Sequence, residues 1–196
     1  MTVMLPARQG SMSHSIRFEN CRMIAQILTS QRQGSSCLPF YLGLDREQFY
    51  VAIDCCLSTR MLLNDGYLDA CNDEDVRQVL LEQRQEEAGE LYALLTDYRL
   101  GEHESELWIA QIIVAGCMGG GHLWHDLGLQ NRTMLNELLN GNFPALAQMN
   151  SQDMKWKKFL YRQLCERGGD YICRAPSCQE CQSFKDCFGS EEQPHP

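Results

Sequence analysis

The chain has 196 residues, a length that suits one globular domain or one domain with a small appendage. Hydrophobic residues make up 44% and charged residues 22%, which predicts a folded core and excludes a mainly disordered chain. The net charge of −9 opposes binding to phosphate backbones, so no nucleic-acid partner is expected. No apolar run is long enough to span a bilayer and no secretory signal is visible, so we expect a cytoplasmic protein with no membrane partner.

Helical spacing begins early in the chain. Residues 1–14 are expected to form a disordered arm, and apolar spacing predicts a helix over 16–31. Asp45 and Gln48 stand in the pattern of a capping box, which predicts a second helix from Arg46 to about Leu57. Apolar residues at helical spacing over 73–99 predict a further helix, with Asp73 at its N-cap.

The second half of the chain continues this pattern. Residues 107–118 are apolar on every side, which predicts a buried central helix ended by Gly119-Gly120-Gly121. Asn131 is the expected N-cap of a short helix, and Pro144 can begin another helical turn.

A last helix is expected from Asp153 to about Arg167. One arc of this helix holds four apolar residues and a glutamine, and the opposite arc holds three cations: Trp156, Phe159, Leu160, Gln163 and Leu164 against Lys155, Lys158 and Arg162. Since no stretch alternates with period two, the prediction is an all-α, irregular multi-helix domain over 15–169. A C-terminal cysteine-rich segment that binds a metal or cluster follows at 170–189, and a disordered tail at 190–196.

Eleven cysteines are many for a chain without a secretory signal, and an odd number cannot all pair within one monomer. Metal ligation is therefore favoured over disulfides. Four of them crowd together with the spacing C-x(4)-C-x(2)-C-x(5)-C: Cys173, Cys178, Cys181 and Cys187. Thiolates this close repel one another unless a cation neutralises them, and binding it would fold the segment in the same step. These four are the predicted metal ligands and cofactor-binding residues.

The spacing favours an iron–sulfur cluster over zinc without excluding zinc. Structural zinc sites usually pair two short cysteine knuckles separated by a dozen or more residues, and the second gap here is too short. The first three cysteines match the run of plant-type ferredoxins, although the compressed fourth gap departs from it. Cys165, His122 and His125 are candidates for an extra ligand.

All four lysines of the chain lie in or beside this cysteine-rich end. The pattern fits either a solvated helix face or an anionic object held nearby. No acid–base or nucleophile constellation is evident in the sequence. We therefore expect a carrier of metal rather than an enzyme.

The second half of the chain resembles the NifQ family of nitrogen-fixation proteins. The resemblance is strong over about 107–189 and rests on several short stretches together with the four-cysteine spacing. These stretches are Cys117-Met118-Gly119, His122-Leu123-Trp124, Asp126-Leu127-Gly128-Leu129, Phe143-Pro144, Met154-Lys155-Trp156-Lys157-Lys158-Phe159, Tyr161-Arg162, Leu164-Cys165 and Cys173-Arg174-Ala175-Pro176-Ser177-Cys178.

The resemblance implies a protein that carries an iron–sulfur cluster containing molybdenum and donates molybdenum for synthesis of the nitrogenase iron–molybdenum cofactor. It implies that Cys173, Cys178, Cys181 and Cys187 are the cluster ligands. The implied partners are the cofactor-assembly scaffold and the nitrogenase iron protein, with molybdate as the source of molybdenum. Two alternatives stay open: a small iron–sulfur electron-transfer protein, and a structural zinc-binding interaction module.

Overall fold

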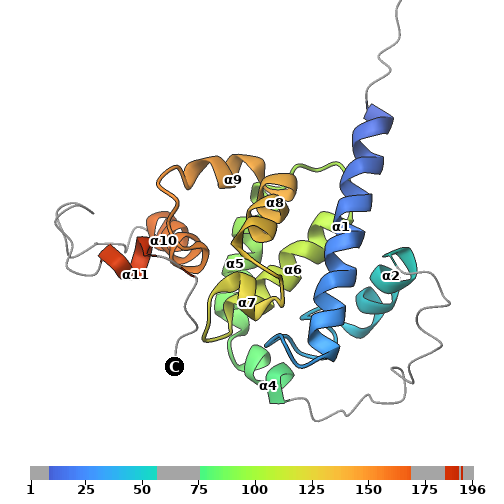
Figure 1. Cartoon of the computed structure of the whole chain (residues 1–196), viewed down its shortest axis with the longest axis horizontal. Helices are drawn as coiled ribbons and strands as arrows, with labels where there is room; N and C mark the ends of the chain where they lie inside the picture. The colour runs from blue at the N-terminus through green and yellow to red at the C-terminus, as the bar shows by residue number, and fades with distance from the viewer. Residues whose placement is uncertain (1–8, 57–75, 169–183, 190, 192–196) are drawn as a thin grey trace, which may run out of the picture.

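The structure is a computed structural model that describes residues 9–56, 76–168, 184–189 and 191. Within these ranges the regular elements are helices and no strand occurs, which confirms the all-α prediction (Figure 1). None of the described helices has the length and apolar character needed to cross a membrane.

The first two helices pack side by side along one edge of the molecule. Helix α1 spans Gln9–Arg32, so it takes in the second half of the expected arm, and α2 spans Arg46–Cys56. The predicted capping box starts α2, because the Gln48 amide donates to Asp45 Oδ1 over 2.8 Å and the Asp45 amide donates to Gln48 Oε1 over 3.4 Å.

The single helix expected over 73–99 is two helices in the structure. Helix α4 spans Val76–Gln83 and α5 spans Gln85–Asp97, with Arg84 between them at φ −112° and ψ 29°. The almost wholly polar stretch from Gln83 to Glu90 explains the break. Helix α5 buries Leu91, Leu94 and Leu95, whereas α4 has no buried residue. Asp73 lies outside the described residues.

Helix α6, Ser105–Cys117, is the central helix that its apolar sequence predicts. It contacts α1, α2 and α5, and almost all its side chains are buried. The chain before α2 also passes close over it, because a Cβ on Gly43, which has φ +87°, would lie 2.5 Å from Cβ of Ala115.

Three short helices follow the glycine run. They are α7 (Leu123–Asp126), α8 (Arg132–Asn142) and α9 (Pro144–Met149). The predicted N-cap of α8 is confirmed, since Asn131 Oδ1 accepts from the amide of Met134 over 3.0 Å.

Helix α10 spans Trp156–Gly168 and α11 spans Phe184–Phe188. The predicted apolar arc of α10 is buried at Trp156, Phe159 and Leu160. The predicted start at Asp153 is wrong. Asp153 has φ +53°, and its amide donates to the Asn150 carbonyl over 3.0 Å, so a tight turn precedes the helix.

Candidate functional site

Of the four predicted ligands, the structure places Cys187. It lies in α11, half-buried and packed against the hydrophobic core. Cys173, Cys178 and Cys181 lie outside the described residues, so their prediction as metal ligands stays untested. Cys165, a candidate extra ligand, is exposed on α10.

The end of the cysteine-rich segment is attached to the start of α10. The backbone amide of Lys155 donates to the Cys187 carbonyl over 2.7 Å, and Lys155 Nζ donates to the Lys185 carbonyl over 3.0 Å. The Gly189 amide closes the turn by donating to the same Lys185 carbonyl over 3.0 Å. These contacts fix one predicted ligand, and the end of its segment, beside the lysine cluster of α10.

A pocket of about 470 Å³ lies next to this attachment. Three parts of the chain form it: the glycine run after α6, the first turns of α10, and the C-terminal residues Asp186 and Glu191. Its other lining residues are Arg84, Glu87, Cys117, His122, Leu123 and Tyr161.

Asp126 connects the glycine run to α10. Its side chain is 6% exposed, accepts from the Gly121 amide over 2.9 Å, and forms an ion pair with the Lys157 ammonium group. Lys157 also donates to the Gly119 carbonyl over 2.7 Å. The Lys157 ammonium group is therefore neutralised by an internal ion pair. The other two lysines near the start of α10, Lys155 and Lys158, also line the pocket.

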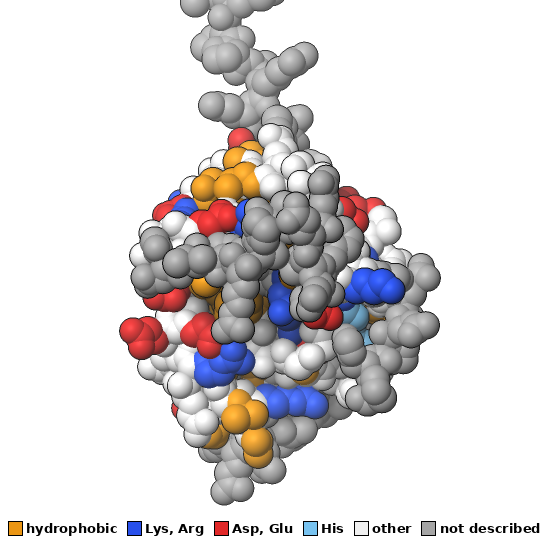
Figure 2. Space-filling model, turned by 90° about the vertical axis from the view of Figure 1, so that its left-hand side faces the viewer, with side chains coloured by type: hydrophobic (Ala, Val, Ile, Leu, Met, Phe, Trp, Pro, Cys, Tyr) orange, Lys and Arg blue, Asp and Glu red, His pale blue; other side chains and the backbone are white. Residues whose placement is uncertain are grey.

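The opposite wall of the pocket is an ion pair with a tyrosine. Arg84 and Glu87 are 2.6 Å apart, and Tyr161 donates its hydroxyl to Glu87. The hydrogen bond from Arg84 holds the pKa of Glu87 below its usual range, so this carboxylate stays charged. Burial and the bond to Glu87 raise the pKa of Tyr161, which keeps the phenol protonated. Acidic and basic side chains are interspersed on this face of the molecule (Figure 2).

Glu191 closes the pocket on the C-terminal side. It is buried and lies 2.9 Å from Arg132, with His122 Nδ1 at 4.0 Å. Burial raises the pKa of this carboxyl, while Arg132 acts in the opposite direction.

The two candidate histidines lie in different settings. His122 precedes α7 and lines the pocket, with its side chain 13% exposed. His125 is 65% exposed and does not line the pocket, although its Nδ1 is 3.7 Å from Asp126. Of the two, His122 is therefore the better placed beside the described end of the cysteine-rich segment.

Two further cysteines lie near the pocket: Cys117 is buried and contributes to its lining, and Cys37 is partly buried. Burial raises the pKa of Cys117 to about 12, and burial together with Asp126 raises the pKa of Cys37 to about 11. Both thiols stay protonated at neutral pH, and only thiolates bind metal strongly. Burial therefore disfavours the thiolate form of Cys37 and Cys117 in the metal-free protein.

The sequence did not indicate a second group of cysteines, on α1 and α2. Cys21, Cys55 and Cys56 bring their sulfur atoms within 4.8 Å of one another, close enough to share one metal ion. Cys21 and Cys56 are joined as a disulfide, although disulfides were the less favoured expectation. The adjacent cysteines on α2 were a partial signal, but their partner comes from a distant part of the chain.

Comparison with known proteins gives one consistent result. The family model described as NifQ matches residues 23–189. The chain is 44% identical to Protein NifQ of Azotobacter vinelandii over 94% of this chain and 97% of that protein. It is 46% identical to the Protein NifQ homolog of Sinorhizobium fredii over 50% of this chain and 43% of that protein.

A shorter match is to Protein NifQ of Klebsiella pneumoniae, 48% identical over 41% of this chain and 48% of that protein. No solved structure matches the chain. The family model covers most of the chain, including the cysteine-rich segment and every pocket-lining residue except Glu191, and the Azotobacter relative matches nearly end to end. The chain therefore belongs to the NifQ family of nitrogen-fixation proteins.

Proposed function

We propose that this chain is a molybdenum-carrying iron–sulfur protein that processes molybdenum and donates it for synthesis of the nitrogenase iron–molybdenum cofactor. Membership of the NifQ family is the observation that carries the proposal. Cys173, Cys178, Cys181 and Cys187 would hold the cluster, and molybdate would supply the molybdenum. The chain then acts as a cytoplasmic metal carrier and not as an enzyme.

The chemistry of the donor set fits this cargo. Thiolate is a soft ligand that suits iron–sulfur clusters, and four cysteines within one short segment can surround a single cluster. The described end of the segment supports the fit, because Lys155 donates to the carbonyls of Cys187 and Lys185 and so brings an ammonium group to this end of the segment. Nearby ammonium groups favour thiolate over thiol. When bound, the cluster supplies the sulfide-bridged site at which molybdenum is held.

The pocket supports the arrival of an anionic metal source. Lys155 and Lys158 line it, and molybdate is an anion that such charges attract. Lys157 has a different task, since its ion pair with Asp126 holds the glycine run against α10. The chain would thus gather molybdate close to the segment that carries the thiolates.

The exposure of the cysteine-rich segment's described end supports the donation of molybdenum to a partner protein. Lys185 and Asp186 in α11 are exposed, so a second protein can approach the segment on this side. Molybdenum would leave by exchange of its ligands for those of the receiving protein. The proposed receivers are the cofactor-assembly scaffold and the nitrogenase iron protein.

A transfer experiment tests this function. Protein loaded with molybdenum is mixed under anaerobic conditions with the assembly scaffold and the nitrogenase iron protein, then separated, and the metals in each fraction are measured. The proposal predicts that molybdenum leaves this chain and appears in the acceptor fraction. Full retention of molybdenum with reversible redox cycling would overturn donation and favour the electron-transfer alternative.

The role of the pocket is tested with a matched pair of cation substitutions. Lys158→Gln removes an exposed charge at the pocket and should lower the rate of molybdate loading about two- to fivefold. Arg99→Gln removes an exposed charge at the end of α5, away from the pocket, and should leave the rate unchanged. Equal rates in both variants would remove the pocket from the loading step.

A further inference from the structure

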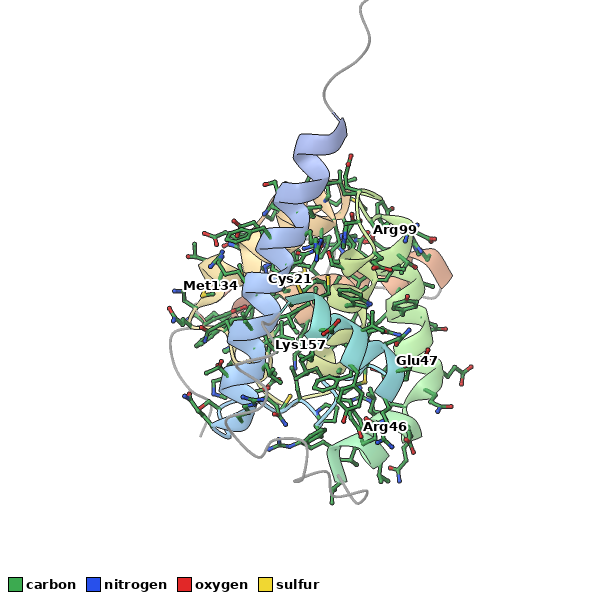
Figure 3. The ribbon with its side chains drawn as sticks, turned by 90° about the vertical axis from the view of Figure 1, so that its right-hand side faces the viewer. Cys21, Arg46, Glu47, Arg99, Met134 and Lys157 are labelled. Carbon is green, nitrogen blue, oxygen red and sulfur yellow. A yellow bond between two sulfur atoms is a disulfide. The ribbon has the colours of Figure 1, made fainter. Side chains whose placement is uncertain are left out.

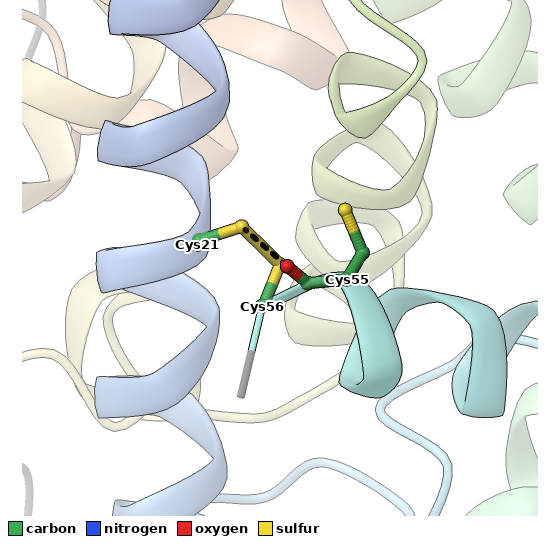
Figure 4. Close-up of side chains that lie close together, drawn as sticks. All are labelled: Cys21, Cys55 and Cys56. Carbon is green, nitrogen blue, oxygen red and sulfur yellow. Dashed lines mark hydrogen bonds between the residues drawn. A yellow bond between two sulfur atoms is a disulfide. The ribbon is translucent and has the colours of Figure 1, made fainter. Parts of the chain in front are cut away.

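The contact between α1 and α2 carries a second sulfur-rich site. Cys21 lies in the middle of α1, and Cys55 and Cys56 end α2. Figure 4 shows the three side chains at this contact, with Cys21 and Cys56 joined by the disulfide, and Figure 3 places Cys21 on the α1 ribbon. Cys55 adds a third sulfur from the same turn of α2, within 4.8 Å of the other two.

The site is accessible, and it has a positive charge beside it. All three cysteines are half-buried, in contrast to the fully sealed Cys117. Arg17 lies one turn before Cys21 on α1, and its Nη2 donates to the Cys55 carbonyl over 3.5 Å. This contact places one guanidinium group next to the cysteines.

The spacing of the sulfur atoms fits one tetrahedral ion. Zinc–sulfur bonds of about 2.3 Å place neighbouring thiolates roughly 3.8 Å apart in such a site. The 4.8 Å limit places Cys55 Sγ within about an ångström of this spacing, and the Cys21 and Cys56 sulfurs must separate to it once their disulfide is reduced. Three thiolates leave the fourth position for water, and the half-exposed setting gives water access.

We propose that Cys21, Cys55 and Cys56, when reduced, bind one thiophilic divalent cation of the zinc class. The site is separate from the C-terminal cysteines and does not depend on the function proposed for them. It joins α1 to α2 through metal–sulfur bonds in the reduced protein and through the disulfide in the oxidised protein.

The two states interconvert by balanced steps. A dithiol reductant gives two electrons and two protons to the bond between Cys21 and Cys56, which yields two thiols, and the reductant becomes a disulfide. The cation then displaces three protons, one from each thiol, and the resulting complex has a net charge of −1. Arg17 lies beside this negative charge. The disulfide and the bound ion are thus mutually exclusive.

The test uses the full chain with the C-terminal ligands removed. A variant with serine at Cys173, Cys178, Cys181 and Cys187 is reduced and freed of metal under anaerobic conditions. It is titrated with cobalt(II), whose charge-transfer absorption reports thiolate ligands, and then with zinc, which displaces cobalt. We expect one equivalent of cobalt to bind with this absorption and zinc to remove it.

Single substitutions in that background identify the ligands. Adding Cys55→Ser should weaken zinc binding at least about tenfold, because it removes one of three thiolates. Adding Cys165→Ser, at an exposed cysteine of α10, should leave binding unchanged. Circular dichroism shows whether each variant retains its helices. A variant with Cys55→Ser that keeps its helices and its full affinity would overturn the proposal.

A second measurement uses the unsubstituted chain. Zinc should slow alkylation of reduced Cys55 at least about tenfold, measured by mass spectrometry of its peptide. Equal alkylation rates with and without zinc, or no cobalt absorption in the serine variant, would contradict the proposal and leave the disulfide as the only function of the pair. Because the serine variant lacks the C-terminal thiols, such a failure does not bear on molybdenum transport.

Discussion

The cysteines of the helical body lie in two contrasting settings. Cys117 is buried and Cys37 is partly buried beside Asp126, and burial raises the pKa of both thiols. Cys21, Cys55 and Cys56 are half-exposed and lie within 4.8 Å of one another. The same side chain therefore acts as a packing group in one region and offers a ligand in the other. Solvent access and the proximity of other sulfur atoms decide which role it takes.

The largest expected difference between the two groups of cysteines is in their rate of alkylation. In the reduced, metal-free protein, iodoacetamide should modify Cys55 and Cys165 long before Cys117. The pKa of Cys117 is raised from 9.0 to about 12, so its thiolate fraction near neutral pH falls by about a thousandfold. Mass spectrometry of the peptides over time measures the rates. Modification of Cys117 at the same rate as Cys165 in the folded chain would show that the Cys117 thiol is accessible to solvent.

The next largest effect is expected from substitution of Asp126, which connects the glycine run to Lys157 of α10. Asp126→Ala leaves the ammonium group of Lys157 largely buried without its carboxylate, and this should lower the free energy of unfolding by about 3–5 kcal/mol. Urea unfolding followed by circular dichroism measures it. The control is Asp97→Ala, which breaks an exposed pair with Arg167 and should cost less than about 1 kcal/mol. Similar losses in both variants would contradict the central position of Asp126.

A pair of glycine substitutions tests how tightly this region is packed. A Cβ on Gly119 would lie 2.5 Å from both Cys37 Sγ and Asp126 Oδ2, whereas a Cβ on Gly120 meets nothing within 4 Å. Gly119→Ala should therefore destabilise the protein by about 1–3 kcal/mol. Gly120→Ala should have little effect in the same unfolding assay. Equal stability of the two variants would show that the glycine run is not packed against Cys37.

The smallest expected effect is a dependence of stability on alkaline pH. In the unfolded chain the thiols of Cys37 and Cys117 have a pKa of 9.0. Folding raises the pKa of Cys37 to about 11 and that of Cys117 to about 12. Above pH 9 the unfolded state binds fewer protons, so the free energy of unfolding falls as pH rises, and the full stability is present below pH 9. At pH 10 the fully buried Cys117 accounts for about 1.4 kcal/mol of this loss, and the partly exposed Cys37 for less because solvent screens its charge.

Urea unfolding between pH 8 and pH 10 in the presence of reductant measures this dependence. Cys117→Ala should reduce the slope by at least about half, because the larger of the two contributions is gone. Cys165→Ala should leave the slope unchanged. Identical slopes in the protein with and without Cys117 would contradict the raised pKa.

The sequence alone predicted those features of the fold that depend on neighbours along the chain. The capping box of Asp45 and Gln48, the N-cap at Asn131, and the apolar arc of α10 are local patterns, and the structure confirms each of them. The four-cysteine spacing is local as well, and it led to the family that the comparisons confirm. Its three N-terminal members lie outside the described residues.

Features that depend on distant contacts were not predicted. The start of α10 is shifted by a turn in which Arg132, far away in sequence, binds Asp153 over 2.8 Å. The site of Cys21, Cys55 and Cys56 arises only where α1 packs on α2, and Cys21 and Cys56 are 35 positions apart in the sequence. Apolar periodicity gives the buried face of each helix, but it does not say which helices face each other.

Metal analysis shows whether the C-terminal cysteines hold an iron–sulfur cluster that contains molybdenum. The chain is purified anaerobically from cells supplied with molybdate, and its iron, sulfide, molybdenum and zinc are measured beside a Cys178→Ala variant and a Ser177→Ala control. The account predicts a brown protein with iron, sulfide and molybdenum, loss of all three in Cys178→Ala, and retention in Ser177→Ala. A colourless protein holding zinc in their place, or iron without molybdenum, would contradict it.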